Sequence, residues 1–269
     1  MITVGCESEK RNTIRIIKMS TFFTCRLYFY ILGKADTIMG CISEITGHTR
    51  LTGLLGSPVS HSKSPLMHNE AYRLLGLDYV YLCFDVPENN LQVAFEGLKK
   101  LNVAGFNCTM PDKTLMSKLV DELSPAAKII GAVNTVVNDN GKFVGHNTDG
   151  TGYIRSLQDC GHDIVGKKMT LLGSGGAASS ICVQAALDGA REIDVLSIKD
   201  ILTNATPIGM APNTDGCLVK DSSILRPELI VSDIIYNPLE TKLYKMAKEK
   251  GCSVFNGLYM LLYQGAEAF

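Results

Sequence analysis

The sequence predicts an α/β fold with a largely parallel sheet, divided into two domains. Strand-like and helix-like segments alternate from residue 51 onward, which is typical of this fold class. A glycine-rich turn at residues 173–178 lies between a strand and a helix, as in dinucleotide-binding sheets. The 269 residues are 46% apolar, enough to bury one large core or two ordinary ones. A change of pattern near residue 150 predicts the domain boundary.

In the first half of the chain, apolar spacing and turn residues predict the elements. Pro111 ends the third strand, Ser124-Pro125 starts a short helix with a cap and a first-turn proline, and Asp139-Asn140-Gly141 predicts a hairpin turn. The expected strands are Leu51–Gly56, Tyr79–Val86, Ala104–Thr109 and Ala132–Asn138, and the expected helices are Leu66–Leu75 and Leu91–Leu101.

The second half is expected to begin with a helix over Gly150–Leu157. A strand at Met169–Leu172 then leads into the glycine-rich turn and a helix that runs to about Leu187. Two further strands, Glu192–Ser197 and Ile201–Asn204, follow in close succession.

Charge and cysteine content exclude several classes of protein. A net charge of −1 argues against non-specific nucleic-acid binding, which needs excess positive charge. The nine cysteines form no C-x-x-C pair and the five histidines complete no zinc pattern, so we expect no metal site. An odd number of unpatterned cysteines fits a reducing cytoplasm, and no apolar run reaches the ~18 residues of a membrane span. We therefore expect a cytoplasmic protein that contacts neither nucleic acid nor membrane.

Residues 1–38 form a basic extension without a periodic pattern, to which we assign no function. Its apolar part, Phe22–Leu32, is interrupted by Arg26, which argues against a signal peptide. Met39 is the expected natural start of the folded protein.

The glycine-rich turn has the pattern G-x-G-x-x-A. Gly173 allows a tight turn, Gly175 lets a pyrophosphate approach the backbone, and Ala178 lets the helix and strand pack closely. The following helix offers free N–H groups and a partial positive charge to phosphates. An ordinary strand–helix turn is the alternative, but the flanking elements favour dinucleotide binding.

Three other segments carry candidate site residues, each with a structural alternative. Ser62 and Ser64 could hold a substrate carboxylate, although Ser64 before Pro65 would also make a good helix cap. Lys113 follows the end of a strand, where α/β proteins bind ligands, although most lysines are merely solvated. Asn134 and Asp149 could equally be turn or cap residues, and spacing alone does not establish that Lys113 and Asp149 meet.

Taken together, the motifs resemble the shikimate dehydrogenase family. They are S-x-S-P, N-x-T-x-P-x-K, G-A-V-N-T, N-T-D-G and G-x-G-G-A-A, followed by Asn204-Ala205-Thr206, Asp233 to Pro238 and Gln264-Gly265-Ala266. The resemblance covers residues 51–269. The sequences of residues 147–153 and 263–269 most resemble those of the shikimate/quinate dehydrogenase branch.

The resemblance implies an NADP- or NAD-linked interconversion of 3-dehydroshikimate and shikimate, with dehydroquinate and quinate as a further pair, by a monomer or homodimer. It implies that Lys113 and Asp149 are catalytic, and that Ser62 and Ser64 hold the substrate carboxylate. The implied ligands of the ring hydroxyls are Thr109, Asn134, Asp149 and Gln264. The implied cofactor-binding residues are Gly173, Ser174, Gly175, Gly176, Ala177, Ala178, Asn204, Thr206, Tyr236 and Gly257.

The chain departs from the family pattern after its second cofactor-domain strand. The family has some tens of residues there, including an Asn-Arg pair for the 2′-phosphate of NADP. Here Ser197-Ile198 take that place and only Lys199 is basic. The chain also stops at Phe269, before the family's usual final helix. Because parallel neighbours ordinarily need a long crossover, we expect Glu192–Ser197 or Ile201–Asn204 to leave its place, exposing apolar surface and weakening cofactor binding.

The expected organisation is a substrate domain at 39–149, a shortened dinucleotide domain at 150–256 and a C-terminal helix at 257–269 that returns to the substrate side. A second interpretation is an inactive remnant that binds shikimate without turnover. A one-carbon folate dehydrogenase of related architecture is a third, which the serine pair and the N-T-D-G segment disfavour.

Overall fold

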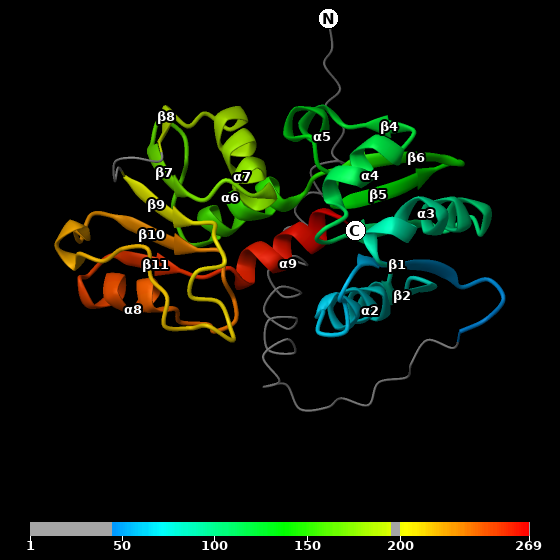
Figure 1. Cartoon of the computed structure of the whole chain (residues 1–269), viewed down its shortest axis with the longest axis horizontal. Coiled ribbons are helices and arrows are strands. Elements are labelled where there is room, and N and C mark those ends of the chain that lie inside the picture. Colours follow the sequence, from blue (N-terminus) through cyan, green and yellow to red (C-terminus); the bar gives the residue numbers. More distant parts are fainter. Residues whose placement is uncertain (1–44, 195–199, 269) are drawn as a thin grey trace, which may run out of the picture.

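The computed structural model describes residues 45–194 and 200–268. They form two lobes side by side, each built on its own sheet (Figure 1). The N-terminal extension and the segment Ser197–Lys199, which the sequence singled out, lie outside the described residues.

The first lobe has a six-stranded mixed sheet in the order β2-β1-β3-β5-β6-β4. Its strands are β1 (Arg50–Gly56), β2 (Tyr79–Asp85), β3 (Gly105–Cys108), β4 (Glu122–Leu123), β5 (Thr135–Asp139) and β6 (Lys142–His146). β1 pairs in parallel with β2 and β3, whereas β5 runs antiparallel to both β3 and β6. The predicted hairpin is confirmed: Asn140 and Gly141 take positive φ angles of 53° and 94°, as a tight turn between β5 and β6 requires.

Helices cover both faces of this sheet. Side chains alternate along β1, so Leu55 packs with the large cluster under α3 and α4, while Leu54 packs with Tyr72 of α2 on the other face. The Ser124 hydroxyl caps α5 by accepting from the Ala127 N–H, as predicted. The helical elements are α2 (Ser64–Leu75), η1 (Glu88–Asn90), α3 (Leu91–Lys100), α4 (Lys113–Leu119) and α5 (Pro125–Ile130).

The second lobe has a five-stranded parallel sheet in the order β11-β10-β9-β7-β8. Its strands are β7 (Lys168–Leu172), β8 (Glu192–Asp194), β9 (Ile201–Asn204), β10 (Ile230–Asp233) and β11 (Ser253–Phe255). This is the doubly wound order without, among the described residues, the outer strand that would follow β8. The sheet is therefore Rossmann-like and shortened.

The expectation that β8 or β9 would leave its place is wrong. Both strands pair in parallel with β7, and Met169 lies opposite Ile193 on one side and Ile201 on the other. Asp194, the last described residue of β8, lies opposite Thr170, and Ile201 lies opposite the adjacent Met169. The two residues are therefore two strand spacings apart across the sheet and one residue apart along it. Six residues can span roughly 20 Å, more than the ~10 Å of two strand spacings.

The helical elements of the second lobe are α6 (Asp149–Asp159), α7 (Gly176–Leu187), η2 (Ser222–Ile224), α8 (Lys242–Glu249) and α9 (Leu258–Glu267). α6 and α7 cover one face of the sheet and α8 the other. Figure 1 shows α9 lying between the lobes, and it contacts both α6 and α2. Among the described helices, none combines the length and apolar character that crossing a membrane requires.

Candidate active site

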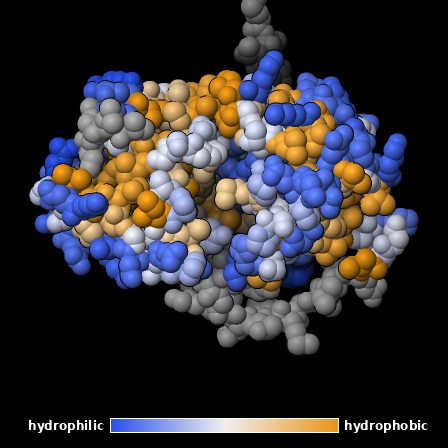
Figure 2. Space-filling view, in the orientation of Figure 1, coloured by the Kyte–Doolittle hydropathy of each residue, from blue (hydrophilic) through white to orange (hydrophobic). Residues whose placement is uncertain are grey.

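A cavity of about 370 Å³ opens between the two lobes, and the space-filling surface is hollowed there (Figure 2). The ends of β1 and β3 and the starts of α2, α4 and α6 supply its walls on one side, and α9 closes the other. All the residues predicted to be catalytic or to bind substrate line it: Ser62, Ser64, Thr109, Lys113, Asn134, Asp149 and Gln264.

Lys113 and Asp149 meet in this cavity. The Lys113 Nζ lies 2.5 Å from Asp149 Oδ2, and the two side chains are only 22% and 9% exposed. Lys113 is the first residue of α4 and Asp149 the first residue of α6. The structure thus brings together two residues whose spacing in the sequence left the contact open. An ammonium donor and a carboxylate acceptor therefore lie side by side, with little exposure to solvent.

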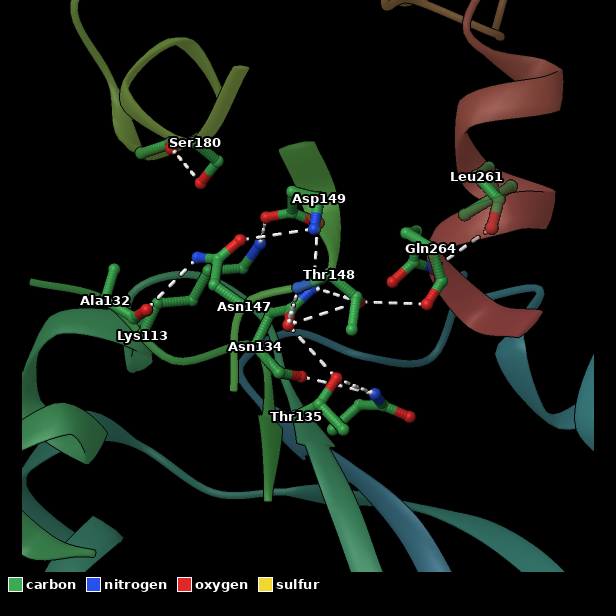
Figure 3. A network of polar contacts seen from close by, with 12 residues as sticks. Lys113, Ala132, Asn134, Thr135, Asn147, Thr148, Asp149, Ser180, Leu261 and Gln264 are labelled. Carbon is green, nitrogen blue, oxygen red and sulfur yellow. Dashed lines mark hydrogen bonds and ion pairs between the residues drawn. The ribbon is translucent and has the colours of Figure 1, made fainter. Parts of the chain in front are cut away.

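Asn134 holds Asp149 from the other side (Figure 3). Its amide nitrogen donates to Asp149 Oδ1 and to the Thr148 hydroxyl, both at 2.9 Å. Its amide oxygen accepts from the Thr148 N–H and the Thr135 hydroxyl. Both amide protons and both oxygen lone pairs of Asn134 are therefore engaged with protein.

The serine pair differs from the predicted helix cap. Lys63 occupies the N-cap position of α2 without a side-chain cap bond, and Ser64 is already inside the helix. The Ser62 hydroxyl instead accepts from the Ser64 N–H at 3.2 Å. The interpretation of Ser64 as a cap is thus wrong, because the helix begins one residue earlier than the Ser-Pro pattern indicates.

The glycine-rich turn leaves open space in front of the N-terminus of α7. Gly173 has φ +128°, and a Cβ there would lie 2.8 Å from the Ala205 carbonyl oxygen, so only glycine fits. Gly175 is the N-cap of α7, and added Cβ atoms at Gly175 and Gly176 would meet nothing within 4 Å. Open space before free helix N–H groups fits a dinucleotide phosphate. The turn, with Ser174, Ala177 and Ala178, does not line the substrate cavity.

The remaining candidate cofactor residues fall into two groups. Tyr236 and Gly257 line the cavity, and a Cβ on Gly257 would lie 1.8 Å from the Ile234 carbonyl oxygen. Asn204 and Thr206 do not line it. The Asn204 amide oxygen accepts from Thr206 at 2.7 Å and its nitrogen donates to Asp233, a carboxyl whose pKa burial raises. These two side chains shape the loop after β9.

Sequence reasoning assigned no role to Asn107 and Thr148, although both lie inside the motifs. Asn107 lines the cavity, and its amide oxygen accepts from the Tyr81 hydroxyl at 2.7 Å. The Thr148 hydroxyl donates to the Gln264 carbonyl at 2.9 Å. Their places in N-x-T-x-P-x-K and N-T-D-G were the available signals.

Known proteins resemble this chain in both sequence and structure. Residues 54–136 match the family described as "Shikimate dehydrogenase substrate binding domain". A shikimate dehydrogenase (NADP(+)) of Listeria monocytogenes serotype 4b is 48% identical, over 84% of this chain and 91% of the relative.

Two solved structures share the fold. A Listeria monocytogenes shikimate 5-dehydrogenase in complex with shikimate and NAD has a TM-score of 0.80 and 45% identity, covering 87% of this chain and 93% of that one. A shikimate dehydrogenase in complex with NADP+ also has a TM-score of 0.80, with 38% identity, covering 85% and 91%.

The alignment with the Listeria relative is longer than the part of this chain that it covers. The aligned stretch spans 266 residues but takes up only 84% of this chain, which is about 226 residues. About 40 residues of the relative thus have no counterpart here. Only residues 195–200 separate the described part of β8 from β9, which is fewer than a crossover between parallel strands ordinarily takes. Because a relative that is 48% identical is matched over 91% of its length, and a solved structure at 45% identity shares the fold, the chain belongs to the shikimate dehydrogenase family, and it lacks about 40 residues of that relative.

Proposed function

We propose that this chain catalyses the reversible NADP(H)- or NAD(H)-linked reduction of 3-dehydroshikimate to shikimate, with dehydroquinate and quinate as a second substrate pair. The observation that carries the proposal is the Lys113–Asp149 ion pair, which lies in a cavity between the first lobe and the dinucleotide-type sheet. Proton transfer at a carbonyl oxygen needs a positioned donor of this kind.

In the reduction, the bound cofactor supplies a hydride to the carbonyl carbon of the substrate. The Lys113 ammonium donates a proton to the carbonyl oxygen, so the product is a hydroxyl and Lys113 is left neutral until solvent reprotonates it. Asp149 stabilises the ammonium before the transfer and aligns it. In the oxidation, neutral Lys113 accepts the hydroxyl proton as the hydride leaves.

Substrate binding is assigned to the polar groups that face the same cavity. Ser62 and Ser64, at the start of α2, hold the carboxylate, and Thr109 and Gln264 hold ring hydroxyls. Because the Asn134 amide is engaged with Asp149 and Thr148, we propose that it acts on the ring hydroxyls chiefly by orienting Asp149.

The cofactor is assigned to the turn from Gly173 to Ala178 for its pyrophosphate, and to Tyr236 and Gly257 for the end that enters the cavity. Asn204 and Thr206 are assigned to the cofactor through the loop after β9, which their hydrogen bond shapes. The corresponding organisation is a substrate domain at 39–149, a dinucleotide domain at 150–256 and a returning helix at 257–269. The missing segment removes contacts on the far side of β8, so we expect weaker cofactor binding than in a chain that carries it. A cytoplasmic monomer or homodimer remains our prediction.

The test is initial-rate turnover of the purified chain with shikimate and quinate, each against NADP and NAD. A matched variant carries the roughly 40 residues of the Listeria relative between Asp194 and Ile201. We expect turnover of shikimate in both proteins and a lower KM for the cofactor in the variant. If neither protein turns over either substrate, the proposal fails. Turnover by the variant alone, with shikimate binding by both in calorimetry, would favour the alternative of a shikimate-binding remnant.

A further inference from the structure

Thr148 occupies a position whose usual hydrogen bond it does not make. It is the N-cap residue of α6, where a threonine oxygen ordinarily accepts from an N–H of the first helical turn. Here the side chain makes no cap bond. The hydroxyl donates instead to the Gln264 carbonyl of α9 at 2.9 Å and accepts from the Asn134 amide nitrogen at 2.9 Å. The side chain is thus committed to two other parts of the fold.

Figure 3 shows these contacts as one connected network. The Asn134 nitrogen donates to the Thr148 hydroxyl. The single hydroxyl proton has its shorter contact, 2.9 Å, with the Gln264 carbonyl, and its longer one, 3.3 Å, with the Asn134 oxygen. The Thr148 N–H meanwhile donates to the Asn134 oxygen at 2.9 Å. Thr148 therefore presents one donor and one acceptor that fit Asn134 in only one of its two amide orientations.

The orientation of Asn134 decides what Asp149 meets. In the observed orientation an amide N–H faces Asp149 Oδ1 at 2.9 Å while Lys113 faces Oδ2. With the amide reversed, its oxygen would face the carboxylate and its N–H groups would face the Thr148 N–H. Both contacts would be repulsive, so the Thr148 contacts keep the carboxylate in place.

We propose that Thr148 is a positioning residue. Its hydroxyl is anchored to the Gln264 carbonyl of α9, and it holds the Asn134 amide in the orientation that keeps Asp149 in place. The proposal rests on the proposed function, in which Asp149 aligns Lys113 for proton transfer. The Thr148 hydroxyl thereby connects three parts of the fold that line the cavity. These are the first lobe through Asn134, the start of α6, and α9 through the Gln264 carbonyl.

The test compares Thr148→Val, which keeps the shape and removes the hydroxyl, with Thr148→Ser, which restores it. Thr151→Val is the matched control, because Thr151 lies on the same helix, donates to Gln184 and does not line the cavity. We expect Thr148→Val to lower kcat roughly 10- to 100-fold while the shikimate Kd changes less than about threefold. Thr148→Ser and Thr151→Val should stay within about twofold of the parent. A kcat for Thr148→Val within twofold of the parent, or no recovery with serine, would overturn the proposal.

A crystal structure of Thr148→Val gives a readout that needs no turnover. We expect the Asn134 nitrogen to move beyond hydrogen-bond distance of Asp149 Oδ1, and an unchanged contact of 2.9 Å would contradict the proposal. An inactive parent would count against the proposed function alone, because this structural comparison still decides the role of Thr148. If Thr148→Val does not fold, Thr148→Cys, with its weak hydrogen-bonding group, replaces it under the same criteria.

Discussion

Lys113 Nζ lies 2.5 Å from Asp149 Oδ2, although the two residues are 36 positions apart. One begins a helix of the substrate-side lobe and the other begins the first helix of the second lobe. The contact therefore forms only when the strand before α4 and the strand before α6 lie in the same sheet with their ends together. The Lys113–Asp149 ion pair therefore depends on the fold of the first sheet as well as serving the proposed chemistry.

Replacing Lys113 by alanine removes the proposed proton donor. General acid–base catalysis contributes about 10²–10⁴-fold, so kcat should fall by that order with a much smaller rise in KM. Initial rates with shikimate measure both. Lys118→Ala is the control, since Lys118 is an exposed lysine of the same helix that does not line the cavity. A Lys113→Ala variant that keeps more than about a tenth of the parent kcat would rule the assignment out.

The two serines allow substrate binding and stability to be measured side by side. Ser64 makes no side-chain cap bond but its hydroxyl hydrogen-bonds Tyr81, so Ser64→Ala should weaken shikimate binding and cost about 1 kcal/mol of stability. The Ser62 hydroxyl accepts from the Ser64 N–H, so Ser62→Ala should weaken binding and also cost about 1 kcal/mol of stability. Calorimetry and thermal unfolding measure the two effects. Unchanged shikimate affinity in both variants would mean that neither serine holds the carboxylate.

The glycine-rich turn allows ligand approach and backbone strain to be tested separately. A methyl group at Gly175 meets no protein atom within 4 Å, so Gly175→Ala should keep the parent melting temperature while NADP and NAD bind at least about tenfold more weakly. Gly173→Ala should lose stability as well, because Gly173 has a positive φ and its added Cβ would lie 2.8 Å from the Ala205 carbonyl. Cofactor titrations on both variants provide the measurement. Parent-like cofactor affinity in Gly175→Ala would show that the phosphates bind elsewhere.

Local patterns predicted most of the fold. The hairpin at Asn140-Gly141, the glycine-rich turn and the alternation of strands and helices depend on neighbours in the sequence, so periodicity and turn residues identify them. The relative levels of β8 and β9 could not be predicted in this way. They depend on how each strand pairs with β7, where Asp194 and Ile201 lie opposite the neighbouring residues Thr170 and Met169.

The candidate site was predictable as a set of residues but not as a network. The motifs pointed to Lys113, Asn134 and Asp149, yet the direction of each hydrogen bond depends on tertiary contacts. Asn134 lines the cavity, and its amide also engages Asp149 and Thr148, which the motifs did not indicate. Thr148 has no predicted role because its contact with the Gln264 carbonyl joins residues 116 positions apart, which no local pattern indicates.

His68 should make the protein sensitive to acid. It is a buried residue of α2 whose ring stacks on Tyr81 at 4.3 Å, and burial lowers its pKa from 6.5 to about 4. Above pH 6.5 both the folded and unfolded forms carry a neutral ring, so His68 has no effect on stability there. As the pH falls below 6.5 the unfolded chain binds a proton that the folded protein accepts only near pH 4, so unfolding becomes easier by up to about 3 kcal/mol. His68→Phe keeps a ring for the stack and removes the titrating nitrogen. Between pH 7 and pH 4.5, urea unfolding should show the parent losing about 2 to 3 kcal/mol more than the variant, and equal losses in the two proteins would mean that His68 titrates normally in the folded state.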